Sequence, residues 1–253
     1  MKLKIIQINI FKGKYLDNLV QFLKVEDADF ITMQEVSRGI VSNHTSNVDI
    51  FSYLMDTLGL NGVFHNDVEV VGHPDVLHGN GVLTKYRILE SSQIPLKRNR
   101  PLTVREFGDR KFFPVFPRSI VDAKVDVSGA LIHALSLHGA WTAPPTDNAE
   151  TLRQSELIAK HLKSLDEPFI MGADMNTTPK MQVIKLIEKA AQNFMKGSGI
   201  KRTTHPQVHK VAYKELLVDY IFASKEFKRL SIKAPAVLVS DHLPVVAEVE
   251  LEI

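Results

Sequence analysis

A short apolar run at Pro168–Asn176, PFIMGADMN, ends in two polar side chains and constrains how the surrounding chain folds. Its residues Phe169–Met171 are typical of a buried strand, and the Gly-Ala pair that follows allows tight backbone packing. Asp174 and Asn176 are two positions apart, so on an extended chain both side chains point to the same face. A turn or a helix cap produces the same pattern. The segment Ser240–His242 near the other end of the chain is a second polar cluster of this kind, and the pair favours a functional site.

Strand and helix patterns alternate on both sides of this run. Lys2–Ile10 and Asp29–Val36 are predicted strands, with an amphipathic helix from Leu16 to Leu23 between them. Further helices are predicted at Ser46–Leu58 and Met181–Ala191. Shorter strands are predicted at 61–65, 79–85, 87–94, 119–127, 130–137, 216–223, 230–233 and 245–251. This is an α/β pattern with more strands than a doubly wound sheet needs, so we expect two packed sheets with helices outside.

The helix that precedes the central strand has a candidate start signal. Asp147 is its expected N-cap, with Glu150 three residues later as the capping-box partner.

Composition sets wider limits on the chain. Its 253 residues, 44% of them hydrophobic, show no linker-like tract, so we expect one domain over residues 1–253. The absence of cysteine excludes a disulfide framework and a thiolate metal site. Lys4, Gln7 and Asn9 interrupt the N-terminal apolar residues, and no run approaches the ~20 apolar residues of a membrane span. These features lead us to expect a cytoplasmic protein.

Polar residues recur at the ends of the predicted strands. They are Asn9, Glu35, His138, Asp174 with Asn176, Asp219 and Asp241 with His242. Each has an ordinary structural explanation, such as a turn residue or a hydrogen-bonded core group. The simultaneous presence of all of them favours a catalytic site.

The order of these motifs resembles the endonuclease/exonuclease/phosphatase superfamily. The matching segments are INI, MQEV, SLHGAW, GADMN, VDYIF and SDHLPV, which together extend from Ile5 to Ala247. The resemblance implies a four-layered α/β sandwich, two packed mixed β-sheets flanked by helices. It also implies a metal-dependent phosphoric ester hydrolase.

The residue types fit hydrolysis of a phosphoester, in which a water must attack an anionic phosphorus. A hard cation, Mg²⁺ or Mn²⁺, takes oxygen ligands, and the expected ligands are Glu35, Asn9 and Asp241. The resemblance implies that Asp174 activates the water. The other expected catalytic residues are Asn176, which would hold the water or a phosphate oxygen, His242 and His138, which would contact the phosphate, and Asp219, which would orient His242.

Two weaker matches suggest substrate-binding residues. Asn80 lies in a GNGVL segment similar to a Gly-Asn-x-x-Leu strand of the family, and Arg118 resembles an arginine that supports the site. Two departures argue against the abasic-site branch. Ile10–Gly13 replaces its Asn/Asp-Gly-Leu-Arg segment, and His138 stands where that branch tends to have tyrosine.

The substrate is predicted from two basic segments. Leu96–Arg118 interleaves seven basic residues with four phenylalanines, and Lys196–Lys214 adds further lysine, arginine and histidine. These segments could follow a phosphate backbone and stack on bases, or the phenylalanines could be core residues below a solvated basic rim. A nuclease acting on DNA or RNA is the first expectation, with no obligate protein partner. The alternatives are a phosphatase or phosphodiesterase of a small phosphorylated molecule or lipid headgroup, and a non-catalytic nucleic-acid-binding homologue.

Overall fold

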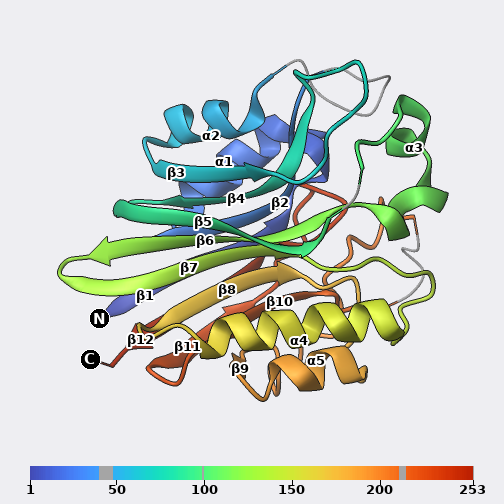
Figure 1. Ribbon diagram of the computed structural model, residues 1–253. Coiled ribbons are helices and arrows are strands. Elements are labelled where there is room, and N and C mark those ends of the chain that lie inside the picture. Colours follow the sequence, from blue (N-terminus) through green and yellow to red (C-terminus); the bar gives the residue numbers. More distant parts are fainter. Residues whose placement is uncertain (40–47, 99, 211–214, 253) are drawn as a thin grey trace.

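The computed structural model describes residues 1–39, 48–98, 100–210 and 215–252 (Figure 1). Its elements, in chain order, are β1 (Lys2–Asn9), η1 (Phe11–Gly13), α1 (Leu16–Glu26), β2 (Phe30–Arg38), α2 (Ile50–Leu58), β3 (Asn61–Asn66), β4 (Leu77–Thr84), β5 (Arg87–Lys97), α3 (Val104–Gly108), η3 (Arg110–Val115), β6 (Arg118–Val127), β7 (Ala130–His138), α4 (Ala149–Lys163), β8 (Phe169–Asp174), α5 (Gln182–Ile187), β9 (Gln192–Asn193), β10 (Asp219–Ala223), β11 (Phe227–Lys233) and β12 (Val245–Leu251).

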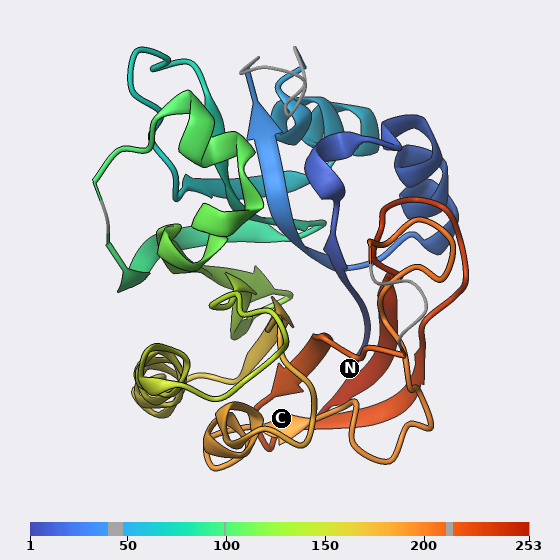
Figure 2. The same cartoon turned by 90° about the vertical axis from the view of Figure 1, so that its right-hand side faces the viewer.

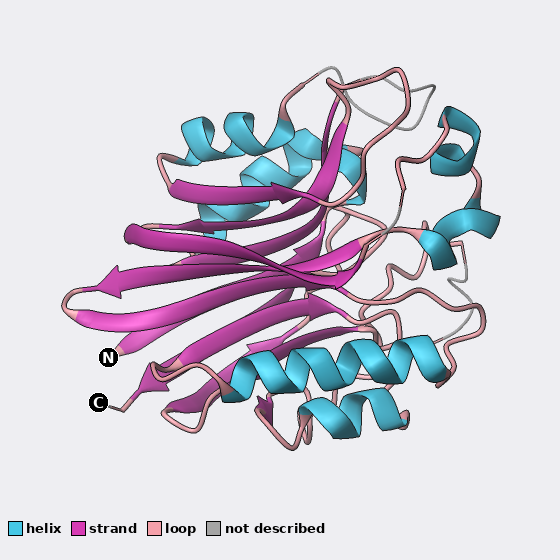
Figure 3. Ribbon diagram, viewed as in Figure 1, coloured by secondary structure: helices cyan, strands magenta, loops and turns pink. Residues whose placement is uncertain are grey.

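Two six-stranded mixed sheets pack face to face. The first has the order β11-β12-β1-β2-β4-β3 and the second β5-β6-β7-β8-β10-β9. Helices α1 and α2 cover the outer face of the first sheet, where Leu19, Leu23 and Leu54 enter a common apolar cluster with strand residues. Helices α4 and α5 cover the second sheet from the opposite side of the molecule (Figures 1 and 3). The expected four-layered α/β sandwich is confirmed.

Several predicted boundaries shift. Strand β10 begins at Asp219 rather than at 216, β11 begins earlier, at Phe227, and α5 ends at Ile187. Helix α2 begins after Asp49, whose side chain accepts a hydrogen bond from the amide of Ser52, and the predicted start of this helix lies outside the described residues. Among the described residues, no helix has the length and apolarity to cross a membrane.

The predicted cap of α4 is wrong. Asn148 is the N-cap and Thr151 its capping-box partner, with the two side chains and backbone amides bonded reciprocally. The carboxylate of Asp147 instead accepts hydrogen bonds from the amides of Gln182 and Val183 at the start of α5. Adjacent Asp and Asn are both good caps, and the contact with a helix far along the chain decides between them.

The two sheets come into close contact at Gly172. A Cβ atom there would lie 1.8 Å from the hydroxyl of Thr32 and 2.5 Å from the amide oxygen of Gln7, so only glycine fits. Around this point a buried polar layer joins the sheets. Gln34 donates to Gln7 and to the hydroxyl of Ser136, at 3.0 and 3.1 Å. This layer lies directly behind the strand ends that carry the polar residues.

Candidate active site

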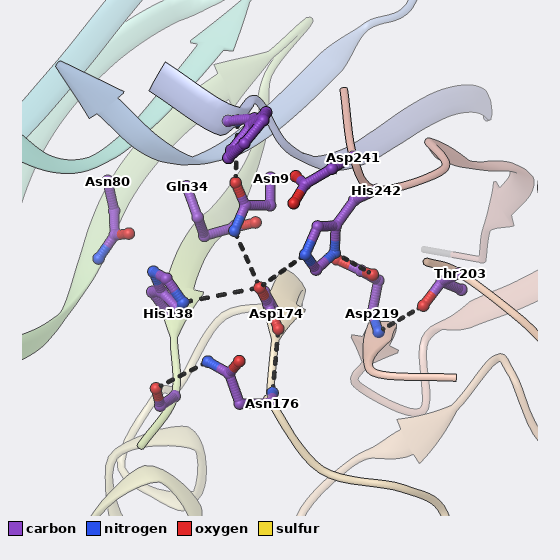
Figure 4. A network of polar contacts seen from close by, with 12 residues as sticks. Asn9, Gln34, Asn80, His138, Asp174, Asn176, Thr203, Asp219, Asp241 and His242 are labelled. Carbon is purple, nitrogen blue, oxygen red and sulfur yellow. Dashed lines mark hydrogen bonds and ion pairs between the residues drawn. The ribbon is translucent and has the colours of Figure 1, made fainter. Parts of the chain in front are cut away.

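The ends of β1, β7 and β8 and the start of β10 carry predicted site residues, and they lie on the side of the sandwich that faces the viewer in Figure 2. Strands β7 and β8 are parallel and end together, with His138 paired to Asp174. Strand β10 is antiparallel and begins at the same edge, so Asp219 pairs with Asp174 from the other side. Asn9 ends β1 of the facing sheet. Strand direction therefore brings together residues that are far apart in the sequence (Figure 4).

Asp174 is the centre of this group. One carboxylate oxygen accepts the amide N–H of Asn176 at 2.9 Å, and the other accepts Nδ2 of Asn9 at 3.0 Å. The Nε2 atoms of His138 and His242 lie 3.6 and 3.8 Å from the same oxygen (Figure 4). Burial raises the pKa of Asp174 to about 6 because it outweighs the opposing charge of His242, and the charge of Asp219 adds a smaller effect in the same direction as burial. This carboxyl is thus suited to exchange a proton near neutral pH.

His242 is held as an imidazolium. Its Nδ1–H donates to Asp219 at 2.8 Å, and Asp219 is fully buried. Burial alone would lower the pKa of His242, but the carboxylates of Asp219 and Asp174 raise it well above its ordinary value. Asp219 is itself fixed, because its amide donates to the hydroxyl of Thr203 at 3.0 Å.

His138, in contrast, is held as a neutral imidazole. Burial lowers its pKa well below the ordinary value, and the positive charges of Arg118 and His242 lower it further. At neutral pH the site therefore places a neutral imidazole on one side of Asp174 and an imidazolium on the other.

Glu35 is aimed by a bulge in β2. The pairing of β2 with β4 shifts between Met33 and Val36, and Glu35 has a positive φ of 54°. Bulges of this kind redirect a side chain out of the regular alternation. Burial alone would raise the pKa of Glu35, but Lys12 and the side chain of Asn9 contribute to a net lowering. The carboxylate is thus held ionised.

Asp241 lies within electrostatic reach of Glu35. Burial and the charges of Glu35 and Asp219 raise the pKa of Asp241 to about 6, against the influence of His242. A cation would relieve the charge repulsion that raises the pKa of Asp241, and oxygen donors suit a hard divalent ion. The residues present therefore fit a metal held by Glu35 and Asp241.

Histidine-containing groups are also close enough for a metal. One ligand atom of each of His209, Asp241 and His242 lies within 4.8 Å of the others, and so do those of Asp174, Asp219 and His242. However, an imidazolium has no lone pair for a metal. The charge state of His242 therefore favours the carboxylate pair over both groups.

Asn80 and Arg118 both interact with the carboxyl group of Asp67. Asn80 donates through Nδ2 to Asp67 at 3.0 Å and to the carbonyl of Ser119 at 3.1 Å. Burial raises the pKa of Asp67 to about 7, although hydrogen bonds from Ser119 and the charge of Arg118 oppose it. The charge of Arg118 also acts on Glu35 and Asp174, which places it near the reaction centre.

The phenylalanines of the basic segment form a small core of their own. Phe107 and Phe116 are 1% and 5% exposed and stack on each other at 6.0 Å, next to His78. Phe112 and Phe113 pack against this cluster and are half-buried. Phe107 and Phe116 are thus unavailable for stacking on bases. They are core residues below the basic rim, which was the second interpretation of this segment.

The second basic segment is hydrogen-bonded to the turn at Ser240–His242. The amide of His205 donates to the carbonyl of Asp241 at 2.7 Å, and that of Leu243 donates to the carbonyl of Thr203. The ring of His209 packs edge-on against His242 at 5.5 Å. Lys214, which the sequence placed in this segment, lies outside the described residues.

Sequence reasoning missed several residues that support the site. Gln7 and Gln34 are fully buried polar residues in otherwise apolar strands, a signal that was available in IIQIN and ITMQEV. Lys12, which affects the pKa of Glu35, lies in the single turn of η1, and Asp67 lies in the loop after β3. No periodicity marks such positions.

The sequence pattern of the endonuclease/exonuclease/phosphatase family matches residues 6–242. The chain belongs to this family. This confirms the resemblance drawn from the six motifs, and the family match covers the predicted catalytic positions from Asn9 to His242. A comparison with curated protein sequences finds no match.

Several solved structures share the fold. An endonuclease/exonuclease/phosphatase from Bacteroides vulgatus has a TM-score of 0.75 and 20% identity, over all of both chains. The mannosyl-6-phosphatase of Bacteroides thetaiotaomicron VPI-5482 has a TM-score of 0.74 and 14% identity, over 98% of this chain and 100% of that one. The human Nocturnin catalytic domain, with a bound sulfate anion, has a TM-score of 0.71 and 17% identity, over 99% of this chain and 93% of that one. At these identities the likeness shows the fold alone.

Proposed function

We propose that the protein is a divalent-metal-dependent hydrolase of phosphoric esters, in which Asp174 activates the attacking water. The observation that carries this proposal is the position of Asp174, buried between an imidazolium and a neutral imidazole with a pKa of about 6. Family membership and the likeness to a mannosyl-6-phosphatase support the reaction class.

The hydrogen bonds of Asp174 define its part in the reaction. Asn9 and the amide of Asn176 hold the carboxylate in one orientation, so a proton can be accepted without rearrangement. The side chain of Asn176 donates to the carbonyl of Gly139 at 3.3 Å, and its amide oxygen and second N–H would hold the water or a phosphate oxygen (Figure 4).

The two histidines would act on the phosphate in different ways. His242 brings a positive charge and an Nε2–H that stabilise charge on the phosphate oxygens, while Asp219 keeps its ring oriented. His138, held neutral, would hydrogen-bond a non-bridging oxygen without adding a second cation.

The metal would be Mg²⁺ or Mn²⁺, held by Glu35 and Asp241 with the amide oxygen of Asn9. When bound it would lower the repulsion between the attacking oxygen and the anionic phosphate. The oxygen of Asn9 accepts the amide of Phe11 at 3.0 Å, which leaves its second lone pair for this role.

Two substrate classes are compatible with the site. The expectation of a nucleic acid rested on phenylalanines and basic residues together, and the burial of Phe107 and Phe116 leaves only the basic residues to support it. Arg98, Arg105 and Arg110 are exposed and would still attract a polyanion. A pocket of about 340 Å³ beside Arg118 favours the other class, a small phosphorylated molecule.

The test is hydrolysis by the purified protein with Mg²⁺, with Mn²⁺ and with EDTA. The substrates would be plasmid DNA, a single-stranded RNA, bis(4-nitrophenyl) phosphate and 4-nitrophenyl phosphate. We expect turnover of at least one substrate that needs metal and falls at least about 100-fold in Glu35→Gln. Glu156→Gln, an exposed carboxylate of α4 outside the site, is the matched control. Turnover that is unchanged in EDTA and in Glu35→Gln would contradict the proposal.

A further inference from the structure

A basic pocket borders the candidate active site at Arg118. It has a volume of about 340 Å³, at the lower end of the range of about 300–1,000 Å³ that is typical of small-molecule sites. The pocket lies between the end of β5, the start of β6 and the loop that follows β3. Its charged lining residues are Lys97, Arg98, Arg100 and Arg118, against Asp67 and Glu69.

These basic residues differ in how far their charge is already neutralised. Arg100 forms a two-pronged ion pair with Glu106, and Lys97 donates to the carbonyl of Pro114 at 2.7 Å. Arg118 is only 5% exposed, yet its guanidinium forms no hydrogen bond or ion pair with any residue in the described ranges. Its one marked contact is the face of the Phe116 ring, 5.9 Å away.

An arginine whose donors face a pocket and have no protein acceptor is suited to bind an anion. Guanidinium has five N–H donors and stays charged in proteins, and the nitrogens of Arg118 bond no protein acceptor although they still reach solvent. An anion that enters from outside would supply the missing acceptors, and a phosphate matches the fork of a guanidinium. Arg118 therefore indicates an anionic ligand.

Arg118 also connects the pocket with the reaction centre. It lines the pocket, and its charge lowers the pKa of His138 and acts on Asp174. Strand β6, which it begins, runs beside β7, which ends at His138. The pocket is therefore a neighbour of the phosphoester site and not a separate cavity.

Asp67 does not oppose an anion here as strongly as an ordinary carboxylate. It accepts hydrogen bonds from Ser119, Asn80 and Gln93, and burial raises its pKa to about 7. Part of the Asp67 population is therefore neutral near pH 7.

We propose that this pocket binds a second phosphate of the substrate, held by Arg118 and Arg98 next to the phosphoester that is hydrolysed. The inference rests on the proposed function, because it names the kind of phosphoester that the site prefers. The second phosphate has two sources, the neighbouring phosphate of a nucleic-acid strand or another phosphate of a small molecule. In either case a substrate with one isolated phosphate is the poorer ligand.

Binding without turnover tests this proposal. Calorimetric titration of Asp174→Asn with adenosine 3′,5′-bisphosphate and with inorganic pyrophosphate is compared with AMP and inorganic phosphate. We expect at least one probe with a second phosphate, in this set or in the dinucleotide pair described next, to bind about tenfold or more tightly than its partner that lacks this phosphate. Adding Arg98→Ala removes this preference, whereas Arg105→Ala, an exposed arginine of the same segment outside the pocket, retains it.

A second set of titrations distinguishes the two possible sources of the second phosphate. The dinucleotides pTpT and TpT are titrated in the same way. A preference confined to pTpT assigns the pocket to a nucleic-acid strand, and a preference for the bisphosphate or pyrophosphate assigns it to a small molecule. Equal affinity within every pair, or a preference that survives Arg98→Ala, overturns the proposal. Because no hydrolysis is involved, this result is independent of the turnover assay.

Discussion

Two clusters of histidines and carboxylates lie on opposite faces of the second sheet. In the outer cluster, under α4, one oxygen of Asp122 bonds His133 at 2.7 Å and the other bonds His161 at 2.9 Å. His133 also reaches Glu167 at 3.3 Å, which in turn pairs with Lys124. Every charged group in this cluster has a partner.

The inner cluster, at the strand ends, is not compensated in this way. Asp219 bonds His242, but the nearest histidine nitrogens of Asp174 are 3.6 Å or more away. Burial raises the pKa of Asp174 to about 6, whereas the hydrogen bonds from His133 and His161 overcome burial and lower the pKa of Asp122. The same residue types thus stabilise the fold in one place and remain available for a ligand in the other.

A change in the inner cluster at the partner of His242 should have a large effect on catalysis. Asp219→Asn removes the charge that keeps His242 protonated and oriented, so we expect kcat/KM to fall about 10²- to 10³-fold. The free energy of unfolding is measured in parallel by urea denaturation. A variant that is folded and fully active would show that His242 does not need this partner.

A change in the outer cluster should have the reverse effect. Asp122→Ala leaves two histidines without their shared acceptor, so we expect a loss of about 3 kcal/mol in the free energy of unfolding. The activity per folded molecule should stay within about twofold, because a network remote from the substrate contributes little to the transition state. Loss of activity without loss of stability would break the contrast between the two clusters.

The smallest expected effect is a pH dependence of stability. Burial alone would lower the pKa of His133, but Asp122 and Glu167 raise it above 6.5. A raised folded-state pKa stabilises the protein fully below the unfolded value and loses this effect as pH rises through the folded value. The difference in unfolding free energy between the wild type and His133→Gln should therefore be larger at pH 6 than at pH 9. Urea denaturation at the two pH values measures it, and a difference that grows with pH would contradict this account.

Much of the fold follows from local sequence patterns. Apolar strands such as FITM and FIMGA, and helices with apolar residues at helical spacing, indicate the layers directly, and the strand directions then bring Asn9, His138 and Asp174 to one edge. Contacts between segments that are distant along the chain could not be predicted from the sequence. Asp147 and Asn148 are equivalent caps until α5 is placed beside them.

The charge states of the site residues could not be predicted from the sequence either. That His138 is neutral while His242 is charged depends on whether a carboxylate lies within bonding distance, which no residue pattern specifies. The burial of Phe107 and Phe116 depends on packing with the loop around Val70 and Val76, and that packing removed part of the argument for a nucleic-acid substrate. The unpartnered guanidinium of Arg118 is visible only when its surroundings are known.

The central claim is that the strand-end carboxylate carries the chemistry. The most direct measurement compares kcat/KM for metal-dependent phosphoester hydrolysis in Asp174→Asn and Asp122→Ala, each corrected for the folded fraction. The account predicts a loss of about 10²- to 10⁴-fold in Asp174→Asn, the range for removing a general base, and nearly unchanged hydrolysis in Asp122→Ala. Full activity in a folded Asp174→Asn protein would contradict it.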